Sequence, residues 1–319
     1  MTTPNPPVES PERSPAPSGA HGAGPVAAAR PTARLADLSA RTALVVVWGS
    51  GFISGKLGLR HAAPYTFAAL RFAIAGLLLL AVAGMRRERL PRGRELLHLA
   101  VAGALVQAVQ FSSIYMGMDL GVPSGLAALI IGLYPLTASL LAVPLLGERV
   151  SAGQYLGLAL GLGGVALAVA DGIHLSGGYL LGLGFLALGL LGISVGTVYQ
   201  KRFCGQMDPV SGNAVQLLAA AAVVLVPALL VEGWDVRLTA AYWPVLLWSA
   251  LINSIVGVGL LYHLLQRHGT SQVSSLFYLV PMSTAGLGAL LLGQRMGPLT
   301  LAGLVLATAG TLLANRVRR

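Results

Sequence analysis

Residues 133–169 read LYPLTASLLAVPLLGERVSAGQYLGLALGLGGVALAV, and the same pattern returns 146 positions further along the chain. Pro135 and Gly147, for example, are matched by Pro281 and Gly293. Both copies consist almost entirely of apolar residues and glycine. The chain therefore contains one apolar segment that is used twice.

The composition places the chain in a lipid bilayer before any motif is considered. Apolar residues make up 55% of the 319 residues and charged residues only 10%. This leaves too little polar surface for a water-soluble globule of this size. A net charge of +10 in a soluble protein would suggest a nucleic-acid partner. Here the charges gather between apolar runs, which is a membrane topology signal, so no nucleic-acid partner is expected.

A long internal repeat in an apolar chain is typical of transporters that are assembled from two copies of a half-domain. The repeat extends upstream at a shift of 145, where Pro64 corresponds to Pro209. We therefore divide the chain into two repeats, residues 41–170 and 178–315. Residues 1–38 hold eight of the eighteen prolines, and this composition predicts a disordered tail.

Ten apolar runs cover the two repeats, and each is near the roughly 20 residues that a helix needs to cross a bilayer. No run shows the alternation of a barrel strand, so the predicted fold class is an all-α integral membrane protein with ten transmembrane helices. The predicted spans are 41–59, 64–84, 95–117, 122–145, 152–170, 178–200, 209–231, 242–266, 271–292 and 297–315.

The positions of lysine and arginine predict the orientation. The loop after the second span carries five arginines between Arg86 and Arg94, which places it in the cytoplasm. Ten crossings then put both termini in the cytoplasm as well. Five helices per repeat is an odd number, so the second repeat is inverted relative to the first. Two inverted five-helix repeats predict transport by alternating access.

Four stretches resemble the EamA repeat of the drug/metabolite transporter superfamily. They are WGSGFISGKLGL at Trp48–Leu59, PYTFAALRF at Pro64–Phe72, YPLTASLLAVPLLGERVSAGQYLGLALGLGGV at Tyr134–Val165 and YLVPMSTAGLGALLLGQRMGPLTLAGLVLATAG at Tyr278–Gly310. The resemblance covers nearly everything after residue 40. It implies a ten-helix bundle in the inner membrane that moves small metabolites, commonly amino acids or their derivatives, and often outward.

The sequence departs from the family pattern at two positions. The family usually has an acidic residue after the glycine in both copies, whereas here Glu148 is matched by Gln294. This puts any role of that acid in the second repeat in doubt. Gly51 stands where the family often has a polar side chain, and we expect this to change the substrate pocket.

Arg71 is the leading candidate for substrate binding, because polar groups at membrane depth are costly unless they line a cavity or bond across helices. It follows Pro64 by seven residues, which is about 10 Å into the second helix. A buried guanidinium recognises carboxylates through paired hydrogen bonds. The alternative is a structural clamp between helices. Its repeat mate is Gln216, which is expected at the matching depth.

The remaining candidates are polar or aromatic side chains within the predicted helices. Gln107 and Gln110 are three residues apart and share one helix face, which suits a solvated pathway or hydrogen bonds between helices. The predicted substrate-binding residues are Trp48, Arg71, Gln107, Gln110, Tyr115, Gln216, Asn253 and Tyr262.

Pro135 and Pro281 are repeat mates inside the fourth and ninth predicted helices. A proline inside a helix frees a carbonyl group and permits a kink. We interpret the pair as hinges that open either side of the pathway, with static kinks as the alternative.

The sequence shows no clustered acids and histidines, no nucleophile beside a base, and no Walker-type phosphate loop. We therefore expect no enzyme activity, no cofactor and no metal. The predicted function is transport of small metabolites, with a lipid-modifying membrane enzyme or a non-transporting subunit as alternatives. The expected partners are the substrate and the lipid bilayer, and the oligomeric state is left open. Because the acids fall at helix ends or in loops, facilitated transport, exchange and proton antiport stay equally open.

Overall fold

The computed structural model describes residues 31–147, 151–171, 177–205, 207–294 and 296–316. These residues form helices and turns, with no strand among them and one isolated backbone bridge between Ala62 and Val236. The helices are α1 (Pro31–Gly58), α2 (Pro64–Met85), α3 (Arg94–Gly103), η1 (Ala104–Val109), α4 (Gln110–Asp119), α5 (Ser124–Ile131), α6 (Tyr134–Leu146), α7 (Ala152–Asp171), α8 (Gly177–Phe203), α9 (Pro209–Leu230), α10 (Tyr242–Leu247), η2 (Trp248–Val256), α11 (Gly257–Leu276), η3 (Phe277–Leu279), α12 (Val280–Leu292) and α13 (Pro298–Arg316).

Seven helical stretches of the described chain are long and apolar enough to cross a bilayer. They are Pro64–Met85, Arg94–Asp119, Ser124–Leu145, Ala152–Ala170, Gly177–Phe203, Pro209–Leu230 and Tyr242–His268. These stretches correspond to the second through eighth predicted spans. The ninth and tenth predictions overlap two shorter apolar helices, Phe277–Leu292 and Pro298–Gly310, and the first overlaps α1, which ends at Gly58.

Two boundaries differ from the predictions by more than a few residues. α1 begins at Pro31, so residues 31–38, which we placed in the tail, are helical. Residues 1–30 lie outside the described part of the chain. α11 continues through residues 267–270, where we expected a loop between two spans. This helix contains no proline to interrupt its backbone hydrogen bonds.

Pro135 and Pro281 are not in the interior of a helix, which corrects our reading of the sequence. The fourth span is interrupted at residues 132–133, and Pro135 lies in the first turn of α6. In the ninth span the 3-10 turn η3 precedes α12, and Pro281 lies in the first turn of α12. A proline is tolerated there because first-turn amides have no acceptor within the helix.

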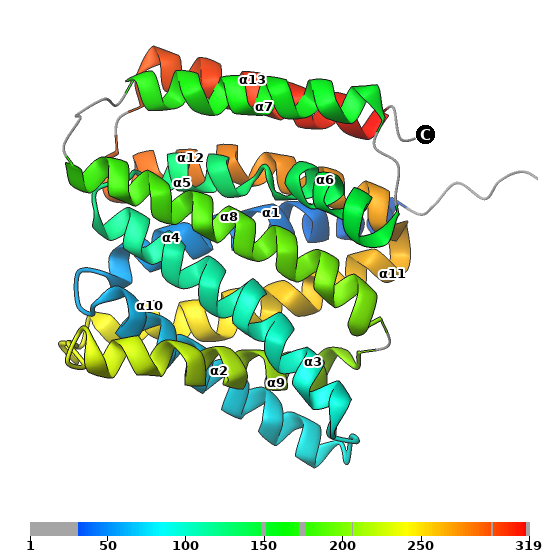
Figure 1. The fold of residues 1–319 in the computed structure, drawn as a ribbon, viewed down its shortest axis with the longest axis vertical. Helices are drawn as coiled ribbons and strands as arrows, with labels where there is room; N and C mark the ends of the chain where they lie inside the picture. The colour runs from blue at the N-terminus through cyan, green and yellow to red at the C-terminus, as the bar shows by residue number, and fades with distance from the viewer. Residues whose placement is uncertain (1–30, 148–150, 172–176, 206, 295, 317–319) are drawn as a thin grey trace, which may run out of the picture.

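The helices form layers in which α7 and α13 lie side by side at one end, and α2 and α9 pack together toward the other (Figure 1). Glycines allow the close approach of α7 and α13. A Cβ atom placed on Gly164 would lie 2.4 Å from the carbonyl oxygen of Gly303, and one on Gly303 would lie 2.3 Å from that of Gly164. In lipid, such close backbone contact supplies much of the attraction between helices.

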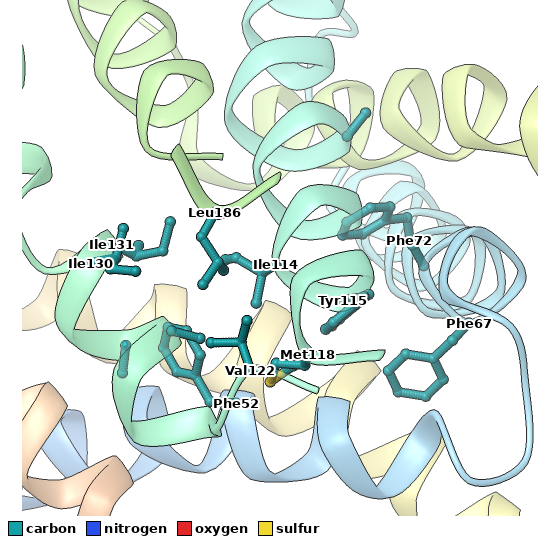
Figure 2. Packing of buried hydrophobic residues seen from close by; sticks show 14 of the residues in the cluster. Phe52, Phe67, Phe72, Ile114, Tyr115, Met118, Val122, Ile130, Ile131 and Leu186 are labelled. Carbon is teal, nitrogen blue, oxygen red and sulfur yellow. The ribbon is translucent and has the colours of Figure 1, made fainter. Parts of the chain in front are cut away.

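The main core lies between these layers, where α2, α4, α5 and α8 meet. Figure 2 shows Phe67 and Phe72 of α2 close to Tyr115 of α4, with Leu186 of α8 on the other side of that helix. The Phe67 and Tyr115 rings meet edge to face, with centroids 5.2 Å apart. This packing holds α4 between α2 and α8, and so fixes one wall of the cavity described next.

Candidate functional site

A cavity of about 150 Å³ lies where both halves of the chain meet, and its wall is mostly aliphatic and aromatic. A cavity of this volume has room for a benzene ring. The lining residues are Trp48, Gly51, Phe52, Arg71, Val106, Gln107, Gln110, Phe111, Ile114, Tyr115, Ala128, Ile131, Gly132, Tyr134, Ile193, Asn253, Ser254, Val258, Phe277 and Val280.

Of the described residues that line the cavity, Arg71 alone carries a full charge, and its side chain is only 3% exposed. Its Nε donates a hydrogen bond to the hydroxyl of Ser254 at 3.1 Å, and its Nη1 donates to the hydroxyl of Tyr115. The guanidinium carbon lies 4.3 Å from the ring centroid of Phe111, which is a cation–π contact. Arg71 therefore joins α2, α4 and η2 at the cavity wall.

Two π-helical segments contribute to the cavity wall. η1 carries Gln107, and η2 carries Asn253 and Ser254. The segments begin at Ala104 and Trp248, which are 144 positions apart and so nearly one repeat shift. Sequence analysis missed both, because residue patterns do not separate a π-turn from an α-turn. π-Turns recur at functional sites, since the wider turn changes which side chains face inward.

Asn253 connects η2 to α1 beside the cavity. Its Nδ2 donates to the carbonyl oxygen of Val47 at 2.6 Å and to the hydroxyl of Ser50 at 3.2 Å. The hydroxyl of Ser54 donates to its Oδ1 at 3.3 Å. A Cβ atom on Gly51 would lie 3.4 Å from Asn253 Nδ2, so the glycine leaves open space beside this amide.

An aromatic wall closes another side of the cavity. The ring of Phe277 meets that of Trp48 edge to face at 4.9 Å between centroids, and that of Tyr134 at 6.4 Å. These rings offer an apolar surface for a ring or a branched alkyl group.

The structure brings six of the eight predicted residues to the cavity, namely Trp48, Arg71, Gln107, Gln110, Tyr115 and Asn253. Gln216 and Tyr262 are not among the lining residues. Gln216 is buried where α9 packs against α3, and its Nε2 donates to the Sδ of Met207 at 3.2 Å. Arg71 and its repeat mate therefore have different surroundings.

Phe111, Ser254 and Phe277 line the cavity but were not predicted. Phe111 and Ser254 directly follow the predicted Gln110 and Asn253. A regular α-helix rotates by about 100° per residue, so neighbouring residues of a regular helix point in different directions. The π-turns η1 and η2 lie beside or around them and alter that rotation.

The cavity offers hydrogen bonds, one positive charge and aromatic faces. Within the described ranges, no group of three or more His, Cys, Asp and Glu side chains comes together in a way that would hold a metal ion. The lining groups suit reversible binding of a small amphipathic molecule.

Several transporters are similar in sequence to this chain over most of their length. "Uncharacterized inner membrane transporter YedA" of Escherichia coli (strain K12) is 29% identical over 81% of this chain and 82% of its own. "Probable amino-acid metabolite efflux pump" of Salmonella typhimurium (strain LT2) is 29% identical over 86% of this chain and 94% of its own. "Probable terminal-alkyne amino-acid exporter" of Streptantibioticus cattleyicolor is 30% identical over 85% of this chain and 91% of its own.

A protein of known crystal structure shares the fold, with a TM-score of 0.63 and 20% identity over 89% of this chain and 99% of that chain. The sequence model described as the EamA-like transporter family matches residues 38–170 and again residues 180–316. These two matches cover most of the sequence. The chain therefore belongs to the EamA-like transporter family and is a membrane transporter of small molecules.

Proposed function

We propose that the protein exports small metabolites, amino acids or related compounds, across the inner membrane, and that the central cavity binds the substrate. The observation that carries the proposal is a buried cation, Arg71, in a cavity whose other described lining residues are uncharged and mostly aliphatic or aromatic. The printed names of two relatives, an amino-acid metabolite efflux pump and an amino-acid exporter, support the substrate class and the outward direction.

Within the cavity, Arg71 and Tyr115 bind the carboxylate of the substrate, because a guanidinium offers paired N–H donors to it. Gln107, Gln110 and Asn253 form hydrogen bonds with its other polar groups. Trp48 packs against its apolar part. Gln216 and Tyr262 have no place in this proposal, since neither lines the cavity.

The transport cycle we propose is alternating access between two inverted five-helix repeats, residues 41–170 and 178–315, with both termini in the cytoplasm. Pro135 and Pro281 are the hinges. In support, each proline follows a break in a span, and residues at both breaks, Gly132 and Phe277, border the cavity. Movement at these breaks would change the cavity wall directly.

Transport is tested with the purified full-length protein in liposomes, using a panel of radiolabelled amino acids in a counterflow assay. We expect at least one amino acid to accumulate in liposomes with the wild-type protein, and Arg71→Ala to reduce this accumulation at least tenfold. Empty liposomes and Gln216→Ala serve as controls. Absence of counterflow for the whole panel, or full activity of Arg71→Ala, contradicts the proposal. An imposed pH gradient that changes net flux indicates proton antiport.

The inverted topology is tested by labelling single cysteines. Cys204 is the one cysteine of the chain, so Cys204→Ser provides a cysteine-free background. New cysteines placed between α2 and α3 and between α7 and α8 should react from opposite sides of the membrane. Labelling of both from one side contradicts the inversion.

A further inference from the structure

We infer that the cavity selects its substrate by a single negative charge, and that it prefers a monocarboxylate with a compact apolar body to the zwitterionic amino acid of the same skeleton. This inference rests on the proposed function, because it takes the cavity as the substrate site. The inference goes beyond the proposed function because it specifies which charged groups the preferred substrate carries.

The described residues of the cavity wall carry positive charge and no negative charge. The described lining residues include one cation, Arg71, and none of the acidic side chains that the structure describes is among them. A carboxylate that enters the cavity therefore meets an opposite charge, whereas an ammonium group meets none. Burying an unpaired charge is strongly unfavourable, so the wall discriminates between the two.

Arg71 is oriented by neutral partners that leave its charge uncompensated. Ser254 accepts from Nε at 3.1 Å and donates its own proton to the carbonyl oxygen of Ser249 at 3.1 Å. Tyr115 accepts from Nη1, and Phe111 covers one face of the guanidinium. Among the described residues, Arg71 makes hydrogen bonds through Nε and Nη1 and makes none through Nη2. One carboxylate would satisfy this donor and neutralise the cation.

A positive charge on the substrate counteracts the favourable interaction between its carboxylate and Arg71. The ammonium group of an amino acid is attached to the carbon next to its carboxylate, so it is held close to Arg71. Like charges repel strongly where the effective dielectric constant is below that of water. Gln107 and Gln110 offer amide oxygens as acceptors but no negative charge. Removal of the ammonium group should therefore strengthen binding.

The rest of the wall limits the uncharged part of the substrate. Trp48, Tyr134 and Phe277 form the aromatic side, and the cavity of about 150 Å³ has room for one ring or one branched alkyl group. The inferred class is therefore small aryl or branched alkyl monocarboxylates.

The test uses two matched sets of ligands at pH 7. 3-Phenylpropionate, L-phenylalanine and 2-phenylethylamine carry the anion, both charges and the cation on one skeleton. 4-Methylpentanoate, L-leucine and 3-methylbutylamine do the same on an aliphatic skeleton. Binding to the full-length purified protein is measured by titration calorimetry, because protonated carboxylic acids cross lipid unaided and obscure flux. In at least one set we expect the acid to bind at least tenfold more tightly than the amino acid, and neither amine to bind.

Variants show whether Arg71 is the source of the preference. Arg71→Gln should abolish it, Arg71→Lys should retain a weakened preference for the acid, and Gln216→Ala should leave it unchanged. The lysine variant keeps the inference testable if the glutamine variant does not fold. Equal or tighter binding of the amino acids overturns the inference and leaves the proposed function intact. If none of the six compounds binds and the amino-acid panel shows no counterflow, both fail.

Discussion

α2 and α9 are repeat mates of equal length, 22 residues each, and both begin at a proline. The first turn of α9 is capped by the residue directly before that proline. The Asp208 carboxylate accepts from the backbone N–H of Val210 at 3.0 Å and of Ser211 at 2.8 Å. In α2 the corresponding residue is Ala63, which has no side chain that caps the helix.

Glu232, from the loop after α9, supplies the cap that α2 lacks. Its carboxylate accepts from the backbone N–H groups of Tyr65 and Thr66 and from the Thr66 hydroxyl, each at 2.8 Å. The same loop pairs with the turn after α1, where the Ala63 N–H donates to the Asp235 carbonyl oxygen at 3.0 Å. A carboxylate therefore caps both helices. The carboxylate that caps α9 comes from the adjacent residue, whereas the one that caps α2 comes from the other repeat and so joins the two repeats.

The interiors of the two helices differ as well. Arg71 of α2 lines the cavity, whereas Gln216 of α9 is packed against α3. These two equivalent positions therefore face a cavity in one copy and a packed helix interface in the other. The following predictions test this difference.

The largest expected effect is that of Arg71→Met on substrate binding. Loss of a charge-assisted hydrogen bond costs about 1.5–3 kcal/mol, which is roughly a tenfold to hundredfold loss of affinity for a carboxylate ligand. The melting temperature without ligand should not fall, because replacing an uncompensated buried charge with an apolar side chain is often neutral or stabilising. Calorimetry and thermal unfolding in detergent measure the two quantities.

Gln216→Met is the matched control for that experiment and should leave affinity within about twofold, since Gln216 is not at the cavity. A fall of several degrees in the melting temperature of Arg71→Met, with affinity retained, would identify Arg71 as a structural clamp instead.

Next in size is the effect of Gly103→Ala on stability. The new Cβ would lie 2.3 Å from the backbone oxygen of Gln216, so α3 and α9 must separate, at a cost of about 1–3 kcal/mol. Gly76→Ala is the comparison in α2, because its Cβ would lie 2.8 Å from the side chain of Leu218 and 3.2 Å from the Leu218 backbone nitrogen, and so is less close to backbone. We expect Gly76→Ala to lower the melting temperature less than Gly103→Ala does, and equal melting temperatures for the two variants would contradict this difference.

Removal of the two helix caps should lower the free energy of unfolding by modestly different amounts. Removal of a cap costs about 0.5–2 kcal/mol, and we place Asp208→Ala near 1 kcal/mol and Glu232→Ala near 2 kcal/mol. The second value is larger because Glu232 also holds the loop after α9 on α2. In a double-mutant cycle, Glu232→Ala should couple to Thr66→Val. Additive effects of these two changes on the melting temperature would show that the contact contributes little.

The smallest expected effect is the pH dependence of the Asp208 cap. Burial alone would raise the pKa of Asp208, but hydrogen bonds from Ser211 and Val210 outweigh it and lower the pKa below its ordinary value of 3.8. The charged cap therefore contributes its full stability above about pH 4, and this contribution is lost as the pH falls through the lowered pKa. The melting temperatures of wild type and Asp208→Asn should differ at pH 6 and converge in acid. A difference in melting temperature that grows in acid would show that the pKa of Asp208 is raised instead.

Some of these features could be predicted from residues close together in the chain. Long apolar runs predicted the spans, and their lengths match seven helical stretches of the structure. The depth of Arg71 pointed to a position at the cavity or between helices, because its distance from Pro64 along the helix is local information. The cap of α2 could not be found in this way, since Glu232 follows Thr66 by 166 positions.

The sequence alone determined that this is a helical membrane protein with an internal repeat, because composition and the length of apolar runs decide how a chain meets lipid. Only the tertiary structure decided that Arg71 lines the cavity while its repeat mate Gln216 does not, where π-turns occur in the cavity wall, and which carboxylate caps α2. These features depend on contacts between helices that are distant in sequence. A sequence repeat shows which helices are equivalent, but it does not show which helices pack against each of them.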